Sequence, residues 1–290
     1  MINHSVPDWR DPLLVAAFGG WGDAAGVATT CSSFLLKGRD VRTVVDFDPE
    51  ELFVLSETRP RVQVSESGQR TVHWPSISLM SARGEPRDLA VLMGPEPQLR
   101  WRTFAQQVRD FWIQNGSAGP VLLFGAFLAG VAHTSSVVCT GFANKRDLRT
   151  QLVDMGVHPS GYRGPTSIHS ILMDAFDKEG VPCVSIWAAV PHYLASMPNP
   201  KAALALLNHA GQLFDLQLDL REMEEATRTF ETQIDSAIAK TGTTVSFGQP
   251  EIVQESRSSR DESANSGPLP PAEDLVKGVE EFLRQRRPDQ

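Results

Sequence analysis

The chain has few of the residues that build disulfide-linked or metal-binding proteins. Only three cysteines occur among 290 residues, and no two of them form a C-x-x-C pair. Cys31, Cys139 and Cys183 each lie within an apolar run, which predicts buried free thiols in a reducing cytosol rather than disulfide bridges or zinc ligands. The histidines show no i, i+4 spacing, so no catalytic metal is expected.

Long apolar runs and basic clusters are also lacking. No apolar stretch approaches the roughly 18 residues that a membrane span needs, and the first ten residues lack both a basic start and an apolar segment. We therefore expect a soluble, cytoplasmic protein without a signal peptide or a membrane partner. The net charge of −8 argues against nucleic acid as a partner, because phosphate backbones attract basic surfaces.

Several catalytic fingerprints are absent. The sequence contains no G-x-S-x-G, which argues against an ordinary α/β-hydrolase. It matches neither G-x-x-x-x-G-K-[ST] nor G-x-G-x-x-G, so it carries no nucleotide-binding fingerprint. No bound cofactor is therefore expected.

Short apolar runs alternate with amphipathic segments through the first two hundred residues. The runs are Leu13–Phe18, Val41–Phe47, Leu89–Met93, Val121–Leu128, Val137–Phe142 and Val184–Val190. Strands buried on both faces and separated by helices predict an α/β fold with a largely parallel sheet. We assign residues 10–198 to this core, with a β-hairpin inserted at 61–75 where apolar and polar residues alternate around Gly68. That hairpin could serve as a lid or as a subunit contact.

The composition changes twice towards the C-terminus. Residues 199–240 carry apolar residues at helical spacing and form the predicted helical extension, whose acidic side chains fit a solvated face or an acidic docking surface. Residues 241–290 are rich in Ser, Gly, Pro, Glu and Arg, which predicts a flexible linker followed by a short helix over 272–286.

The most informative segment joins the first strand to a helix through Gly19, Gly20, Trp21, Gly22 and Asp23. Asp23 could cap the helix, with Trp21 as a packing plug. Alternatively, the helix N-terminus could hold an anion. A second helix begins near Pro165, with the Thr166 hydroxyl available as a donor. Two such helix ends facing one crevice would form a phosphate or carboxylate site.

Ligands of open α/β sheets bind beyond the carboxyl ends of the strands. Polar residues at these places include Asp23, Glu96, Arg59 and His192. A pocket holding Asp23, Glu96 and a histidine could carry out acid–base chemistry. For His133 and His192, taken singly, a structural hydrogen bond is the favoured role.

Many short motifs, in order and spacing, resemble the proteasome assembly chaperone 2 family, in particular its actinobacterial branch. They extend over residues 10 to 240 and are Phe18-Gly19-Gly20-Trp21-Gly22-Asp23-Ala24-Ala25-Gly26, Asp48-Pro49-Glu50, Thr58-Arg59-Pro60, His73-Trp74-Pro75, Gly94-Pro95-Glu96-Pro97, Tyr162-x-Gly164-Pro165-Thr166 and Val190-Pro191-His192-Tyr193.

The resemblance implies a three-layer sandwich like the purine nucleoside phosphorylase fold, with a mixed sheet and a C-terminal helical extension. It also implies a homo-oligomer, with a trimer as the expected form, and proteasome subunits or another protein as partners. The family supplies no established catalytic residues. The residues that we expect to line a cleft are Gly20, Trp21, Asp23, Arg59, Glu96, Tyr162, Thr166 and His192.

Three functions remain open at this point. We favour a non-catalytic binding or assembly protein that acts as a homo-oligomer. The alternatives are an enzyme on a nucleoside-phosphorylase-like scaffold, acting on a small phosphate- or carboxylate-bearing substrate, and a scaffold unrelated to proteasomes. An ATP-grasp ligase is disfavoured, because no lysine stands beside the glycine turn at Gly19–Gly26 to bind phosphate. Fold alone does not separate these functions.

The C-terminal segment yields the first testable prediction. Deletion of residues 241–290 should leave the melting temperature nearly unchanged, because this composition buries too little apolar area to offset the entropy of ordering. Differential scanning calorimetry of the full and shortened chains measures the effect. A large drop would show that the segment packs on the core or on a neighbouring subunit.

Overall fold

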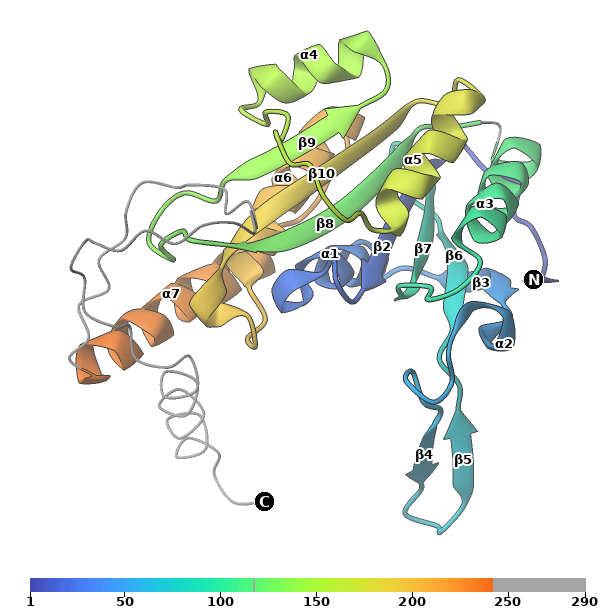
Figure 1. The fold of residues 1–290 in the computed structure, drawn as a ribbon, viewed down its shortest axis with the longest axis horizontal. Coiled ribbons are helices and arrows are strands. Elements are labelled where there is room, and N and C mark those ends of the chain that lie inside the picture. The colour runs from blue at the N-terminus through green and yellow to red at the C-terminus, as the bar shows by residue number, and fades with distance from the viewer. Residues whose placement is uncertain (117, 242–290) are drawn as a thin grey trace, which may run out of the picture.

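A computed structural model describes residues 1–116 and 118–241 of the chain. Its centre is an eight-stranded sheet with the strand order β1-β3-β6-β7-β2-β8-β10-β9. Helices cover both faces of the sheet, and a separate two-stranded hairpin projects from the body (Figure 1). The expected α/β class, a mixed sheet between helix layers, is confirmed. The linker and terminal helix predicted after residue 241 lie outside the described residues.

Four parallel strands form the middle of the sheet. They are β7 (Leu89–Pro95), β2 (Leu13–Gly19), β8 (Val121–Ala129) and β10 (Cys183–Pro191). Nearly every residue of β2 and β10 is buried, as is usual for parallel strands covered by helices on both faces. Parallel pairing brings the carboxyl ends of all four strands to one edge, where the glycine turn after β2 also lies.

Antiparallel strands complete the sheet on both sides. They are β6 (Ile77–Ala82), β3 (Val41–Phe47) and β1 (Ile2–Asn3) beyond β7, and β9 (Cys139–Ala143) beyond β10. All six apolar runs in the sequence coincide with strands. The sequence pattern does not reveal β6, because Ser78 and Ser81 interrupt its apolar residues.

One helix pair covers each face. Helices α1 (Val27–Leu36) and α6 (Pro200–Phe214) share a core cluster with β2, β8 and β10. Helices α3 (Trp101–Asn115) and α5 (Ile168–Lys178) share a second cluster with β2, β3 and β7. The sequence places α6 in an extension, yet its buried alanines and leucines pack in the same layer as α1.

The short helices lie in the connections. They are η1 (Ala24–Gly26) before α1, α2 (Pro49–Leu52) after β3, α4 (Arg146–Asp154) beside the edge strand β9, and η2 (His192–Leu194) directly after β10.

The hairpin consists of β4 (Arg61–Val64) and β5 (Arg70–His73), and every residue in both strands is exposed. It forms a sheet of its own and extends away from the body (Figure 1). A two-stranded hairpin is only marginally stable by itself in water. An arm of this kind, exposed to solvent on both faces, is therefore unusual.

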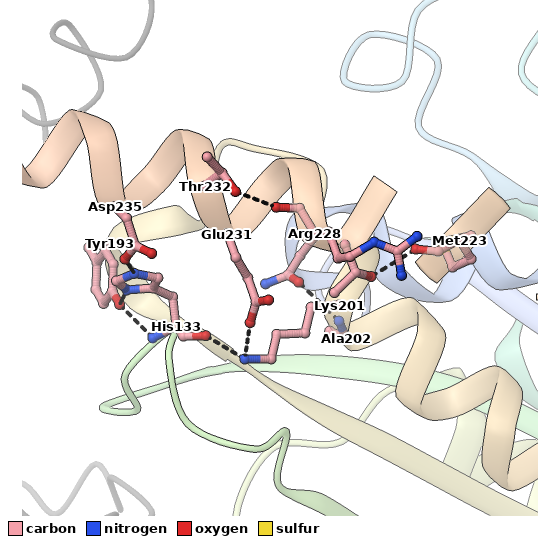
Figure 2. Close-up of polar contacts among 11 residues, drawn as sticks. His133, Tyr193, Lys201, Ala202, Met223, Arg228, Glu231, Thr232 and Asp235 are labelled. Atoms are coloured by element: carbon pink, nitrogen blue, oxygen red, sulfur yellow. Dashed lines mark hydrogen bonds and ion pairs between the residues drawn. The ribbon is translucent and has the colours of Figure 1, made fainter. Parts of the chain in front are cut away.

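The last described helix, α7 (Arg221–Thr241), is fixed to the core through His133 (Figure 2). The two ring nitrogens of His133 lie 2.8 Å from Tyr193 Oη and 2.9 Å from Asp235 Oδ1. Lys201 Nζ donates to the His133 carbonyl at 2.7 Å and pairs with Glu231 at 2.6 Å. Below these contacts, Phe230 and Ile234 of α7 pack with Tyr193 and Leu194.

His133 therefore has the structural role favoured for it from the sequence. Cys31, Cys139 and Cys183 are free and buried, as predicted. Among the helices that the structure describes, none is long and apolar enough to cross a membrane.

The contacts of His133 predict how much stability the protein loses when the attachment of α7 to the core is weakened. Tyr193→Phe removes the hydroxyl that accepts from the His133 amide and contacts its ring. Because buried groups then lose their partner, the variant should be destabilised by about 1–3 kcal/mol. Thr232→Ala is the matched control, since the exposed Thr232 hydroxyl bonds only to the backbone of its own helix. Urea unfolding measures both; equal costs for the two variants would contradict this role for Tyr193.

Candidate functional site

A pocket of about 600 Å³ opens on the sheet face that carries α5. Its floor is formed by β8, β10 and β9, and its rim by the glycine turn, the segment before α5 and α5 itself. Aromatic and apolar side chains dominate the lining, which includes Trp21, Phe127, Leu128, Phe142, Tyr162, Met173 and Trp187. The volume lies within the range of ordinary ligand sites.

The pocket exists because the helix layer on this face is incomplete. The buried side chains of α5 pack with Cys183, Val121 and Leu123 at the first residues of β10 and β8. Among the described residues, no helix covers β9 on the face that lines the pocket, where Phe142 is 51% exposed. A sheet face with exposed aromatic residues is typical of an interaction site.

Trp187 forms the centre of the floor and shapes the glycine turn. Its ring lies flat over Gly125, where any Cβ atom would collide with it, and a Cβ atom at Gly22 would be 3.1 Å from the same ring. Its indole Nε1–H donates to Ser185 Oγ at 2.8 Å. These two glycines are thus required by close approach of an aromatic ring.

His169 stands behind Trp187 and is neutral. Its Nε2–H donates to the Phe124 carbonyl at 2.8 Å, so the other nitrogen, Nδ1, accepts from Ser167 Oγ at 3.0 Å. Burial lowers the pKa of His169 to about 4, because desolvation disfavours the charged imidazolium. Both nitrogens are engaged, so His169 supports the pocket wall and has no free lone pair for a ligand.

Asp23 caps α1 and does not line the pocket. Its Oδ1 accepts from the amides of Ala28 at 2.7 Å and Thr29 at 3.2 Å, and its Oδ2 accepts from the Thr29 hydroxyl at 2.6 Å. Burial raises the pKa of Asp23 despite these hydrogen bonds, which lower it. The capping role is one of the two interpretations that the sequence leaves open.

Glu96 caps the N-terminus of α5, as Asp23 caps the N-terminus of α1. Its backbone amide bonds to the Gly19 carbonyl at 2.7 Å, and its Oε1 accepts from the Ile168 amide at 2.8 Å. Burial raises the pKa of Glu96, while the Ile168 hydrogen bond lowers it. The chain's own carboxylates therefore occupy the N-terminal amides that an exogenous anion would need at both helices.

The residues expected to line one cleft fall into three groups. Trp21, Tyr162 and Thr166 line the pocket, whereas Gly20, Asp23 and Glu96 lie beside it and support the turn and the two helices. Arg59 precedes the hairpin, outside the pocket lining. His192 begins η2, with Nδ1 3.4 Å from the Ala129 carbonyl. Trp21 is 60% exposed, so the alternative role of packing plug is wrong for it.

The strand residues of the pocket floor were not among the site residues expected from the sequence. Thr140 and Phe142 alternate on β9, and Ser185 and Trp187 alternate on β10. A polar-x-aromatic pattern inside an apolar run is the available signal, since alternate residues point to the same face.

Two acidic residues of α5, Asp174 and Asp177, form one side of the pocket. Asp174 pairs with Lys178 at 2.6 Å. The Asp177 carboxylate has no hydrogen bond or ion pair within the described part of the chain, and it lies in the last turn of α5, where the helix dipole disfavours negative charge.

The capping role of Asp23 leads to a pH-dependent prediction. A pKa raised above the ordinary 3.8 means that the folded state binds the proton more tightly, so stability from this group is lost as the pH rises through the raised pKa. Asp23→Asn keeps an acceptor for the amides but does not ionise. Its free energy of unfolding should therefore rise relative to that of the wild type as the pH rises above that range. Asp23→Ala loses the cap and should cost about 0.5–2 kcal/mol.

Urea unfolding of the three proteins at several pH values measures these differences. A stability difference between wild type and Asp23→Asn that stays constant with pH would contradict the assigned environment of Asp23.

The comparisons agree with the family resemblance. The PAC2 family model matches residues 17–238. No match was found among curated proteins. A PAC2 family protein from Streptomyces avermitilis is 35% identical, with a TM-score of 0.70, covering 78% of this chain and 95% of that one. A proteasome-assembly chaperone homologue from Mycobacterium tuberculosis is 30% identical, with a TM-score of 0.72, covering 79% and 96%.

A more distant structure has the same fold. The archaeal proteasome activator PbaB from Pyrococcus furiosus is 14% identical, with a TM-score of 0.63, covering 83% of this chain and 98% of that one. The match of the family model over most of the described residues, together with the two actinobacterial structures, shows that the chain belongs to the PAC2 family.

Proposed function

We propose that this chain is a non-catalytic, cytoplasmic assembly chaperone that acts as a homo-oligomer on proteasome subunits and needs no cofactor. One observation carries the non-catalytic part. The two carboxylates best placed for acid–base chemistry, Asp23 and Glu96, are both used as helix caps outside the pocket.

The groups that do face the pocket favour binding over chemistry. His169 is held neutral, with both nitrogens in hydrogen bonds. The three cysteines lie in the core, outside the pocket lining. Burial raises the pKa of Cys139 to about 12 and also raises those of Cys31 and Cys183, so these thiols do not form the thiolates that nucleophilic catalysis requires. Aromatic and apolar side chains remain as the accessible surface, and such surfaces anchor protein partners.

Membership of the PAC2 family supports proteasome subunits as the partner class. The Mycobacterium tuberculosis structure is described as a proteasome-assembly chaperone homologue. The distant PbaB is described as an archaeal proteasome activator. Both names concern proteasomes, although they describe different actions on them.

The competing proposal is an enzyme acting on a small phosphate- or carboxylate-bearing substrate. Such an enzyme would have to bind the phosphate or carboxylate of its substrate at the N-terminal amides of α1 and α5. Since Asp23 and Glu96 occupy the amides at both helix ends, substrate binding there would require displacement of a half-buried, hydrogen-bonded carboxylate. We therefore rank this proposal second.

Binding to proteasome subunits tests the proposed function. The full chain, tagged, is mixed with recombinant actinobacterial proteasome α-subunits and β-subunits, separately and together, and complexes are measured by size-exclusion chromatography with light scattering. We expect a complex with unassembled subunits and faster assembly in its presence. The absence of any complex with either subunit type would overturn the proposal.

A thermal-shift screen tests the enzyme alternative with the same protein. Ligands that bind only the native state raise the melting temperature. Inosine, adenosine, their monophosphates and inorganic phosphate should produce no shift. A reproducible shift that Asp23→Asn abolishes, while the variant stays folded, would favour the enzyme instead.

A further inference from the structure

The pocket on the α5 face is acidic as well as aromatic. Of the described residues that line it, the charged ones are Asp174 and Asp177, and neither lysine nor arginine is among them. His169 adds no positive charge, because its ring is neutral. Lys178 pairs with Asp174 at 2.6 Å, whereas Asp177 has neither a hydrogen bond nor an ion pair within residues 1–116 and 118–241. The lining therefore holds one carboxylate without a counter-charge.

Asp177 is placed to receive a cation from outside the chain. The residue is exposed, so an external group reaches its carboxylate without any movement of the chain. It lies in the last turn of α5, where the helix dipole disfavours negative charge. A positive group bound at this carboxylate would offset that unfavourable interaction.

The floor beside this carboxylate is elongated. Phe142 of β9 and Ser185 of β10 lie opposite Leu123 of β8, and Phe127 follows four positions after Leu123 on the same face. At about 3.3 Å per residue, the two phenylalanines lie roughly 13 Å apart along the strand direction. An extended peptide has nearly the same rise per residue, so the floor spans about four residues of such a peptide.

The two ends of the floor differ in character. Burial and the negative charge of Asp177 raise the pKa of Cys183, the first residue of β10, which places the carboxylate at the end where β10 begins. The turn that carries Trp21 bonds to Ala126, in the second half of β8, and Trp21 is 60% exposed. A ligand that lies along the floor therefore meets a carboxylate at one end and an aromatic ring at the other.

Many hydrogen-bonding groups of the pocket are engaged within the chain. Ser185 Oγ accepts from the Trp187 indole at 2.8 Å, and Tyr162 Oη donates to the Pro165 carbonyl at 3.0 Å. Both polar atoms of the Asn144 side chain also bond to the backbone. A hydroxyl-rich ligand such as a sugar would find few partners here, whereas apolar side chains would bury aromatic surface, which is favourable.

Arginine is the basic residue that suits both the carboxylate and the floor. Its planar guanidinium donates two parallel hydrogen bonds to one carboxylate and stacks on aromatic faces. Lysine offers a compact, strongly hydrated point charge and does not form the paired hydrogen bonds.

We infer that the pocket binds an extended segment of a partner protein, about four residues long, whose arginine pairs with Asp177 and whose apolar side chains lie on the aromatic floor. This inference rests on the proposed assembly function and names the kind of segment that the bound subunit presents.

Titration calorimetry with short peptides tests the pocket in the full-length protein. The probes are acetylated and amidated Leu-Val-Leu-Arg and Arg-Leu-Val-Leu, one for each direction of binding, and the same peptides with citrulline in place of arginine. Citrulline keeps the shape of the arginine side chain without its charge. We expect the better arginine peptide to bind roughly tenfold tighter than its citrulline counterpart, because the charge pair is shielded from water on binding.

Two substitutions separate the carboxylate from the apolar floor. Asp177→Asn should weaken binding of the arginine peptide roughly tenfold and leave the citrulline peptide unchanged. Phe142→Thr should weaken both peptides equally, since it removes apolar surface. The matched control is Asp154→Asn, which lies in the last turn of α4, outside the pocket lining, and should bind like the wild type. All three positions are exposed, and circular dichroism melting verifies that the variants fold.

Equal affinities of the arginine and citrulline peptides would overturn the inference, as would an effect of Asp177→Asn no larger than that of Asp154→Asn. Failure of every peptide to bind at millimolar concentration would also overturn it. N-acetylarginine amide that binds as tightly as the peptides would indicate a site for small cations, against a peptide segment.

Binding to proteasome subunits, measured for the wild type and Asp177→Asn, separates the two proposals. Peptide selectivity without any subunit complex supports the pocket and overturns the chaperone function. Subunit complexes without peptide selectivity support the chaperone function and overturn the inference. Where both occur, Asp177→Asn should weaken the subunit complex as well, and an unchanged complex would show that the subunits bind elsewhere, against the inference.

Discussion

Asp23 holds the glycine turn against α1, and the arrangement around the pocket depends on this contact. The carboxylate accepts from two amides and one hydroxyl in the first turn of the helix. The turn that it fixes places the Gly22 carbonyl within 2.8 Å of the Ala126 amide, which joins the turn to β8. Gly22 also leaves the space that the Trp187 ring fills. Ala25, whose φ of 55° is unfavourable for a residue with a side chain, and Gly26 at φ 66° are thereby held in one conformation.

Glu96 extends the same constraint to the other face of the sheet. Its amide bonds to Gly19 in the turn, and its carboxylate bonds to the first amide of α5. The start of α5 is thus placed relative to the end of β2 through a single residue. Because α5 forms one side of the pocket, its position there depends on a carboxylate that never faces the pocket. Acidic residues at strand ends are commonly catalytic in α/β proteins, but here their hydrogen bonds explain their presence.

The sequence predicted the elements that depend on local pattern. The six apolar runs became strands, and those in β2, β8 and β10 are almost wholly buried, as continuous apolar segments between helices require. Trp21 was harder to interpret, since the sequence does not say whether a tryptophan in a glycine turn packs inward. Its exposure follows from Trp187, which already fills the space over Gly22 and Gly125. The partner that excludes Trp21 from the interior is 166 positions away in the sequence, beyond the reach of any local pattern.

The floor of the pocket was unpredictable for a similar reason. Trp187 and Phe142 lie in apolar runs that look like buried strands, and each run is indeed part of the sheet. Whether a strand is covered depends on where a helix from another part of the chain ends. Helix α5 covers the first residues of β8 and β10 and leaves the rest of this face and β9 uncovered. An incomplete helix layer thus converts ordinary strand residues into an interaction surface. The aromatic side chains of this surface remain hydrated in the free chain, so covering them is a physical reason for a partner to bind.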